Sequence, residues 1–296
     1  MTSPPVRTLP ASCAHLPLLA GVLAAASFVS MDATIKTLAP RFDAMHLTFF
    51  RFVSGSVFAI ALWLWFRSPL PRRAEWRLHA LRCVLLLVSL VGYFHALRLL
   101  PLAQAVAISY LAPIFISLLA IVVLGERPSR WIWLALTLGL AGTLVSSWPS
   151  LTAGKSAAGS ASLEGLLVGA ASTVAFAGVM VLARRQAQRD AVWTILLVQN
   201  VLPAMVLSLA VGPTWQPPQA TDFWPIMLSG VFATVGLLSL TWAFTHLEAS
   251  RIAPLEYTSF VWAGGLGYLL FGEVPTVTTL ASAALIVGGC LLLLRR

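Results

Sequence analysis

A ten-residue stretch occurs twice in this chain in closely similar form. Residues 119–128 read LAIVVLGERP and residues 266–275 read LGYLLFGEVP. An apolar run, a Gly-Glu pair and a proline therefore recur 147 positions apart. The same register extends without a gap from 93–142 to 240–289. The chain thus contains an internal duplication.

Earlier parts of the chain also match, at an offset of 148 residues. The matching pairs are Gly21 and Gly169, Phe28 and Phe176, Lys36 and Arg184, and Arg41 and Arg189. The change of offset by one residue implies a single insertion or deletion between the two blocks. The duplication therefore covers nearly the whole chain.

The composition is that of a membrane protein. Hydrophobic residues make up 59% and charged residues 10%, and the mean hydropathy is +0.89, whereas soluble domains have about 45–50% apolar and about 25% charged residues. A bilayer requires about 20 apolar residues per spanning helix, and only helices satisfy their own backbone there. We expect an all-α protein with ten transmembrane helices, at about 16–38, 44–66, 79–98, 101–124, 130–147, 163–183, 192–212, 222–245, 250–271 and 276–294.

The helices divide into two five-helix repeats, at 16–147 and 163–294. The Gly/Ser-rich stretch 148–162 is the expected linker. Because five is odd, the second repeat enters the membrane from the opposite side, so a pseudo-twofold axis in the membrane plane relates the two. Inverted repeats of this kind are typical of secondary transporters, in which a central cavity between the repeats opens alternately to each side.

The basic residues predict the orientation. Although a net charge of +9 is common among nucleic-acid-binding proteins, these residues lie in short clusters between apolar runs, and we expect no nucleic-acid partner. With a cytoplasmic N-terminus, 14 of the 19 Lys and Arg residues fall at cytoplasmic ends and four at outer ends, as the positive-inside rule requires. We expect both termini in the cytoplasm. The preference for Arg over Lys is typical of a GC-rich bacterial genome, and we expect the protein to lie in a bacterial inner membrane.

The repeated pattern resembles a known family. An apolar helix ending in Leu124-Gly125-Glu126, a loop with Pro128 and a glycine-containing helix occur once per half. They look like the EamA domain of the drug/metabolite transporter (DMT) superfamily, ten-helix two-repeat type. The segments 31–36 and 50–52 are similar to first-half sequences of that group. One departure is Pro113, which has Phe260 at the corresponding position, so we expect asymmetric walls.

The function that this resemblance implies is secondary transport. We expect an alternating-access exporter of small polar or amphipathic metabolites such as amino acids, exchanged for protons. Import of a nucleoside-like or vitamin compound is the alternative within transport, and a non-transporting scaffold is the alternative outside it. The sequence has no Walker A, His-Glu-x-x-His or Gly-x-Ser-x-Gly motif. We therefore expect no enzyme, no catalytic residue, no metal and no cofactor; the partners are a small molecule, the lipid bilayer and protons.

Ionisable residues inside the predicted spans are the first candidates for a site, because charges are costly in hydrocarbon. Asp32 and Lys36 share a helix face and form either a structural ion pair or part of a substrate or proton site. Arg51 is expected to pair with Asp32 or Asp43 as a gating or structural charge. Two further ionisable residues remain: Glu256, which either lines the cavity or caps a wet helix end, and His95, which either relays protons or packs.

The remaining candidates are polar, aromatic or helix-breaking. We expect Pro113 to kink the fourth helix and free the carbonyl of Ser109. Gln199 stands at the position that Arg51 occupies in the other repeat. The full set of expected cavity-lining residues is Asp32, Lys36, His95, Ser109, Tyr110, Gln199, Trp242, Glu256, Tyr257 and Ser259.

Overall fold

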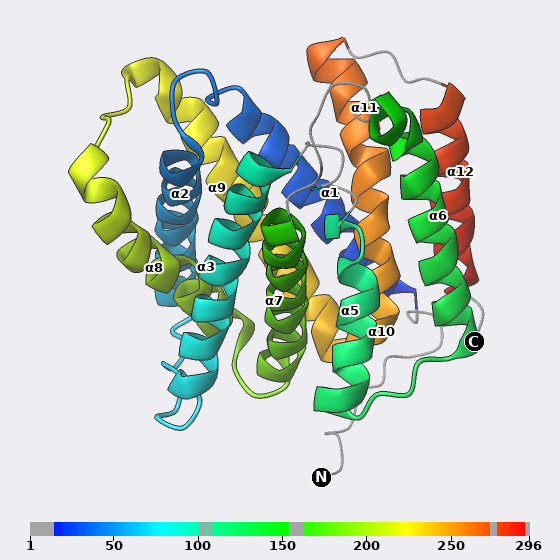
Figure 1. Ribbon diagram of the computed structural model, residues 1–296. Coiled ribbons are helices and arrows are strands. Elements are labelled where there is room, and N and C mark those ends of the chain that lie inside the picture. The colour runs from blue at the N-terminus through cyan, green and yellow to red at the C-terminus, as the bar shows by residue number, and fades with distance from the viewer. Residues whose placement is uncertain (1–14, 101–104, 106–107, 154–162, 273–276, 294–296) are drawn as a thin grey trace.

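The computed structural model describes residues 15–100, 105, 108–153, 163–272 and 277–293, and these residues form helices joined by short loops (Figure 1). The first repeat contains α1 (Leu16–Lys36), α2 (Ala44–Trp65), α3 (Trp76–Leu99), α5 (Ala112–Leu119), the π-helical turn η2 (Ala120–Leu124) and α6 (Arg130–Ala153). The second contains α7 (Leu163–Ala187), α8 (Val192–Val211), η4 (Gly212–Thr214), η5 (Ala220–Asp222), α9 (Phe223–His246), α10 (Ala249–Ile252), η6 (Ala253–Tyr257), α11 (Thr258–Phe271) and α12 (Val277–Leu292).

The helices form an integral membrane protein. Six of them, α1, α2, α3, α7, α8 and α9, are each long and apolar enough to cross a bilayer. Shorter apolar helices complete the remaining spans. The predicted all-α fold with ten spans in two repeats is confirmed. One boundary differs, because α6 continues to Ala153 and so runs into the stretch 148–162 that was expected to be a linker.

The fourth and ninth spans are interrupted at equivalent places. In the first repeat a turn at Tyr110 and Leu111 precedes α5. In the second, the 3-10 turn η6 ends at Tyr257 and separates α10 from α11. The ninth span, expected at 250–271, therefore contains a 3-10 turn within its length. Interrupted helices free backbone groups from the helical ladder, and transporters place them around substrate sites.

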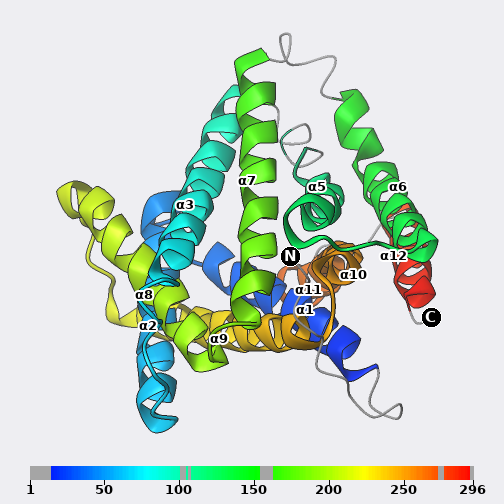
Figure 2. The ribbon, with the colours of Figure 1, turned by 90° about the horizontal axis from the view of Figure 1, so that it is seen from below.

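The helix packing obeys the pseudo-twofold relation. In the first repeat α1 packs on α9 and α11; in the second, their counterparts exchange roles, and α7 packs on α3 and α5. The pairs α2–α8 and α6–α12 each join a helix to its own repeat equivalent. Figures 1 and 2 both show α3 beside α7 and α6 beside α12. The two repeats are thus interleaved, and most helices bury their faces against the other repeat.

Close contact between α6 and α12 depends on paired glycines. A Cβ atom at Gly142 would lie 2.9 Å from the Ser282 carbonyl oxygen, and one at Gly289 would lie 3.1 Å from that of Ala135. Gly142 is the repeat equivalent of Gly289, and Ala135 that of Ser282, so one contact is made twice. Small residues let helices approach closely in membranes.

The repeated Gly-Glu pair has a structural explanation. Gly125 and Gly272 end their helices with φ of 70° and 68°, a left-handed conformation that glycine adopts without steric cost. Glu126 then accepts hydrogen bonds from the backbone N–H groups of Ala249 (2.8 Å) and Ser250 (2.9 Å). The acid therefore anchors the first repeat to the start of α10. Its counterpart Glu273 lies outside the described residues.

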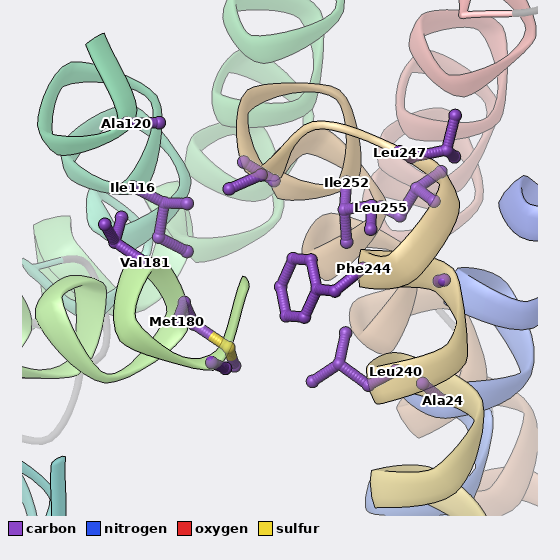
Figure 3. Close-up of a cluster of buried hydrophobic side chains, with 14 of the residues drawn as sticks. Ala24, Ile116, Ala120, Met180, Val181, Leu240, Phe244, Leu247, Ile252 and Leu255 are labelled. Carbon is purple, nitrogen blue, oxygen red and sulfur yellow. The ribbon is translucent and has the colours of Figure 1, made fainter. Parts of the chain in front are cut away.

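A buried apolar cluster joins the two halves beside this anchor. Figure 3 shows Ile116 and Ala120 near Val181 and Met180, with Phe244 and Leu240 on the opposite side. Phe244 is 1% exposed and Val181 1% exposed. The cluster contains residues of α1, α5, α7, α9 and the broken ninth span. Met180 and Leu240 belong to this cluster and also line the central cavity described below, so the cluster lies next to that cavity.

Candidate functional site

A cavity of about 480 Å³ lies between the two repeats. This volume is within the roughly 300–1,000 Å³ range of small-molecule sites. Its walls come from α1, α2, α3, α5, α7, α8, α9, η6 and α11. A space of this size and position can hold a small metabolite between the repeats.

The cavity walls are arranged about the pseudo-twofold axis. Most wall positions occur as repeat-equivalent pairs in which both residues line the cavity. Such pairs are Ala25 and Thr173, Phe28 and Phe176, Asp32 and Met180, Arg51 and Gln199, Phe52 and Asn200, Tyr93 and Leu240, Ser109 and Glu256, and Tyr110 and Tyr257. The cavity therefore lies on the axis, where inverted-repeat transporters place their substrate.

The charges on the walls break this symmetry. Among the described residues, four charged side chains line the cavity: the acids Asp32 and Glu256 and the bases Arg51 and Arg82. Their repeat equivalents are uncharged, in the order Met180, Gln199, Ser229 and Ser109. The two acids balance the two bases formally. A molecule with separated charges would therefore bind in one orientation, although the surrounding walls are nearly symmetric.

Asp32 and Arg51 attract each other across the first-repeat side of the cavity. The exposed surface of Asp32 faces the cavity that it lines. The Nε atom of Arg51 is buried and has no hydrogen-bond partner among the described residues, while its guanidinium lies 5.1 Å from the ring centroid of Phe52. Unsatisfied buried donors are costly, so this side is suited to binding a polar ligand.

Asp43 does not serve as the partner of Arg51. It is the N-cap of α2, accepting from the His46 backbone N–H at 2.9 Å and lying 2.7 Å from the His46 Nδ1 atom. Burial raises the pKa of Asp43, but these hydrogen bonds outweigh it and hold the pKa below its usual value. Of the two expected partners, only Asp32 is near the guanidinium.

The interrupted spans meet inside the cavity. The Tyr257 hydroxyl donates to the Tyr110 carbonyl oxygen at 3.0 Å, at the point where the fourth span breaks. Ser259 donates to the Glu256 carbonyl oxygen at 2.5 Å. These side chains satisfy carbonyl groups near the breaks in both spans. The structure places Ser109, Tyr110, Glu256, Tyr257, Ser259 and Gln199 on the cavity wall, together with Asp32.

Three expected cavity residues lie elsewhere. His95 is exposed, with its Nε2 atom 3.3 Å from Glu164 Oε1, and Trp242 packs on His246 at 4.5 Å between ring centroids. Each is two residues beyond a residue that does line the cavity, which turns it to about the opposite face of its helix. Lys36 shares a face with Asp32 but is exposed at the helix end, beyond the cavity.

Pro113 lines the cavity, and the helical pattern of the fourth span is disturbed directly before it, at Tyr110 and Leu111. It occupies the first turn of α5, just after the break at Tyr110. Proline is well tolerated in a first turn, because that N–H has no helical acceptor. Pro113 therefore begins α5 directly after the turn at Tyr110 and Leu111.

Several wall residues were missed from the sequence. Arg82 is 2% exposed and its Nη1 atom donates to Gln186 Oε1 at 2.7 Å, yet it was counted only as a basic residue of a cytoplasmic end. The available signal was its position inside the predicted span 79–98. Tyr93 is uncharged and carried no such signal.

Two repeat-equivalent ion pairs join the repeats, one at the start of α9 and the other at the start of α3. These two helix starts lie at opposite ends of the molecule. In the Arg41 clasp, Arg41 Nη1 lies 2.5 and 2.7 Å from the carboxylate oxygens of Asp222. In the Arg189 clasp, Arg189 Nη1 lies 3.2 and 3.4 Å from those of Glu75. Figure 1 shows the α1–α2 loop near the start of α9, and the α7–α8 loop near the start of α3 at the lower end.

Comparisons with known proteins give one family. The model of the EamA-like transporter family matches residues 15–148 and 163–295. The pseudopaline exporter CntI of Pseudomonas aeruginosa (strain UCBPP-PA14) is 29% identical, over 94% of this chain and 95% of the relative. The S-adenosylmethionine uptake transporter of Rickettsia bellii is 22% identical, over 92% and 91%. A crystal structure with 23% sequence identity has a similar fold, with a TM-score of 0.76 over 95% of this chain and 96% of the other.

Proposed function

We propose that this chain, which belongs to the EamA-like transporter family of the DMT superfamily, exports small metabolites that carry both a carboxylate and a cationic group. Its family and relatives are transporters and not enzymes. A small-molecule substrate and a membrane environment follow from that membership. The direction of transport, the substrate class and the exchange for protons are our proposals.

The observation that carries the proposal is the polar cavity on the repeat axis. A scaffold would gain stability by filling this centre with apolar side chains, since interiors are close-packed. Here Asp32, Arg51, Arg82 and Glu256 line it instead, and charges inside a membrane-spanning bundle are costly without a function or a partner. This favours a carrier.

The arrangement of charges supports a substrate with both signs. A carboxylate of the substrate would bind Arg51 or Arg82, because guanidinium groups bind carboxylates in planar pairs. Its cationic group would bind Asp32 or Glu256. Phe28 and Phe176, from equivalent positions, would contact an apolar part. Amino acids and their derivatives have this chemistry.

The relatives differ in direction. Export is proposed because the exporter of pseudopaline is more similar in sequence than the S-adenosylmethionine uptake transporter, at 29% against 22% identity. The uptake relative favours import of a nucleoside-like compound as the second candidate. Both candidates use the same cavity.

We further propose that both termini are cytoplasmic and that the protein lies in a bacterial inner membrane, from the distribution of basic residues. The Arg189 clasp then lies at the cytoplasmic end of the cavity and the Arg41 clasp at the outer end. The repeats are proposed to extend over 16–147 and 163–294.

Metabolite profiling tests the function and its direction together. If the protein is an exporter, cells that lack it accumulate a zwitterionic compound and cells that overproduce it release more of that compound. An importer gives the reverse. Uptake of that compound by proteoliposomes, with and without a pH gradient, then tests the exchange for protons; flux that is indifferent to the gradient would remove it.

Charge-removing variants test the cavity. Asp32→Asn and Glu256→Gln should each reduce flux while leaving the amount of folded protein unchanged. Met180→Leu is the matched control, because Met180 lines the cavity at the position equivalent to Asp32 and has no charge to lose. Normal flux in both charge variants would exclude these acids from the site.

A further inference from the structure

Three polar pairs cross from the start of α3 to the end of α7, and we call them the α3–α7 ladder. They are Glu75 with Arg189 at 3.2 Å, His79 with Asp190 at 2.9 Å, and Arg82 with Gln186 at 2.7 Å. The outer pair is partly exposed: the side chain of Arg189 is 45% accessible and that of Glu75 is 17% accessible. The other two are buried. The ladder therefore runs from the protein surface inward to the cavity.

The middle pair is isolated from water at both sides. The side chains of His79 and Asp190 are 2% and 6% exposed. The Arg189 clasp covers them toward the surface. Toward the cavity, Arg82 and Gln186 cover them, and the Arg82 Nε and Gln186 Nε2 atoms have no partner among the described residues. A proton can thus reach His79 either by opening of the clasp or from the cavity, past Arg82.

The other end of the molecule shows that the fold does not require this chemistry. The positions equivalent to His79, Asp190 and Gln186 are Ile226, Phe42 and Leu38, which pack together in an apolar cluster. Only the outermost ion pair is kept, as the Arg41 clasp. Apolar packing often replaces a buried ion pair without loss of stability. The titratable pair at the α3–α7 end therefore points to a function.

The charges around His79 balance without its proton. Asp190 faces it, Glu75 and Arg82 lie about one turn to either side on α3, and Arg189 contacts Glu75. Helix α8, which also packs on α3, has no charged side chain between Val192 and Val211. Two acids and two bases cancel. A proton on the buried imidazole adds one uncompensated positive charge, which favours hydration and hence opening.

We infer that His79, held by Asp190, is a proton-binding site that releases the closure between α3 and α7. The inference rests on the proposed alternating-access function. A proton arriving through the cavity from the outer side binds His79, and the α3–α7 end opens to the cytoplasm. The proton leaves there, substrate enters, and the neutral ladder closes again. Proton entry thus precedes substrate exit, as exchange requires.

A merely structural hydrogen bond is the competing explanation, and hydrogen exchange distinguishes the two without any substrate. The full chain in lipid nanodiscs is followed by mass spectrometry from about pH 8 to about pH 5.5, a range that brackets the ordinary histidine pKa of about 6.5. After correction for the intrinsic pH dependence of exchange, peptides covering 72–82 and 184–192 should exchange severalfold faster at acidic pH. Peptides covering 34–42 and 220–228, which contain no histidine, are the control within the same molecule.

Two variants complete the test. His79→Gln can still donate to Asp190 but cannot take up a proton, so its α3–α7 peptides should stay protected at acidic pH. His95→Gln removes an exposed histidine and should respond like the wild type. A second buried histidine, His46, lies at the other end of the molecule. It bonds to Asp43 and to the Thr214 carbonyl oxygen, so it joins α2 to η4 and is not part of the α1–α9 contact that serves as the control.

Each outcome has a distinct meaning. The inference is overturned if wild-type α3–α7 peptides respond to pH no more than those at the other end, or if His79→Gln keeps the full response. The wild-type comparison decides this even if the variant does not fold. Failure of the proposed function would appear differently, as absence of transport by the wild-type protein in proteoliposomes at every pH.

Discussion

The Arg41 clasp and the Arg189 clasp occupy equivalent places in the two repeats but are supported by different chemistry. Behind the Arg41–Asp222 pair lies the apolar cluster of Leu38, Phe42, Phe50 and Ile226. Behind the Glu75–Arg189 pair lies the polar remainder of the α3–α7 ladder. The duplication preserved the outermost ion pair at both ends, whereas the interior of each closure diverged.

The two ion pairs also differ in strength. Asp222 has a side chain only 5% exposed and also accepts a 2.8 Å hydrogen bond from the Gln219 backbone N–H. Glu75 and Arg189 are more exposed and their contacts are longer. Exposed pairs contribute about 0–1 kcal/mol, whereas breaking a buried pair costs more. The Arg41 end is therefore the more static closure, and the Arg189 end is the one suited to respond to protons.

Moving the buried His–Asp pair to the equivalent positions at the other end of the molecule should have the largest effect. Ile226→His with Phe42→Asp places two polar side chains in the apolar cluster, where Phe42 packs edge-on against Phe50 at 5.1 Å. We expect a loss of about 3–5 kcal/mol in the free energy of unfolding, measured by thermal denaturation in detergent. The reverse transplant, His79→Ile with Asp190→Phe, is the control.

The control should be close to neutral, because replacing a buried polar pair by apolar side chains often is. Equal destabilisation by the two transplants would mean that each end of the molecule depends equally on its own buried residues for stability. The reverse transplant should also abolish the response of the α3–α7 peptides to pH.

Removing one charge from each clasp measures how much each ion pair contributes to stability. Asp222→Asn should lower the free energy of unfolding by about 2 kcal/mol, because Arg41 and the Gln219 N–H lose a buried charged acceptor. Glu75→Gln should cost less than about 1 kcal/mol. Paired thermal unfolding curves measure the difference, and a larger loss for Glu75→Gln would reverse the assignment of the static end.

The repeat architecture could be predicted from the sequence, but the interiors of the closures could not. The Gly-Glu duplication, the ten apolar runs and the family resemblance depend on local composition and periodicity, which survive divergence. The depth of a side chain along its helix could also be estimated, which is why Asp32 and Glu256 were singled out. The hydrogen bond from Tyr257 to the Tyr110 carbonyl oxygen could not be predicted, because it joins residues of different repeats.

Direction around a helix was the main source of error. His95 and Trp242 have the right depth but the wrong face, since nearly every face of these helices is apolar and the hydrophobic pattern does not fix the rotation. Arg82 and His79 were passed over because residues near a span end are ordinarily hydrated. Their burial follows from the α3–α7 contact, which only the fold reveals.

The innermost step of the ladder connects the closure to the cavity. Arg82→Ser introduces the residue found at the equivalent position, Ser229, and removes one of the two wall cations. We expect the KM for the transported compound to rise about tenfold, or about 1.4 kcal/mol in binding, in proteoliposome transport assays. Ser229→Ala is the matched control and should leave KM unchanged. An unaltered KM for Arg82→Ser would confine Arg82 to the closure.

The smallest effect concerns a second ionisable group at the Arg189 end. Glu248 lies between α9 and α10; burial, and then the neighbouring charge of Glu126, raise its pKa above the ordinary 4.5. The unfolded state therefore loses this proton first, and stability falls as pH rises through the interval above about 4.5. Glu248→Gln should raise the free energy of unfolding by less than about 1 kcal/mol at neutral pH and leave it unchanged at about pH 4.

Glu126→Gln is the contrasting variant. It weakens the bonds to the backbone N–H groups of Ala249 and Ser250, so it should lower the free energy of unfolding. A stabilising Glu126→Gln would contradict its anchoring role.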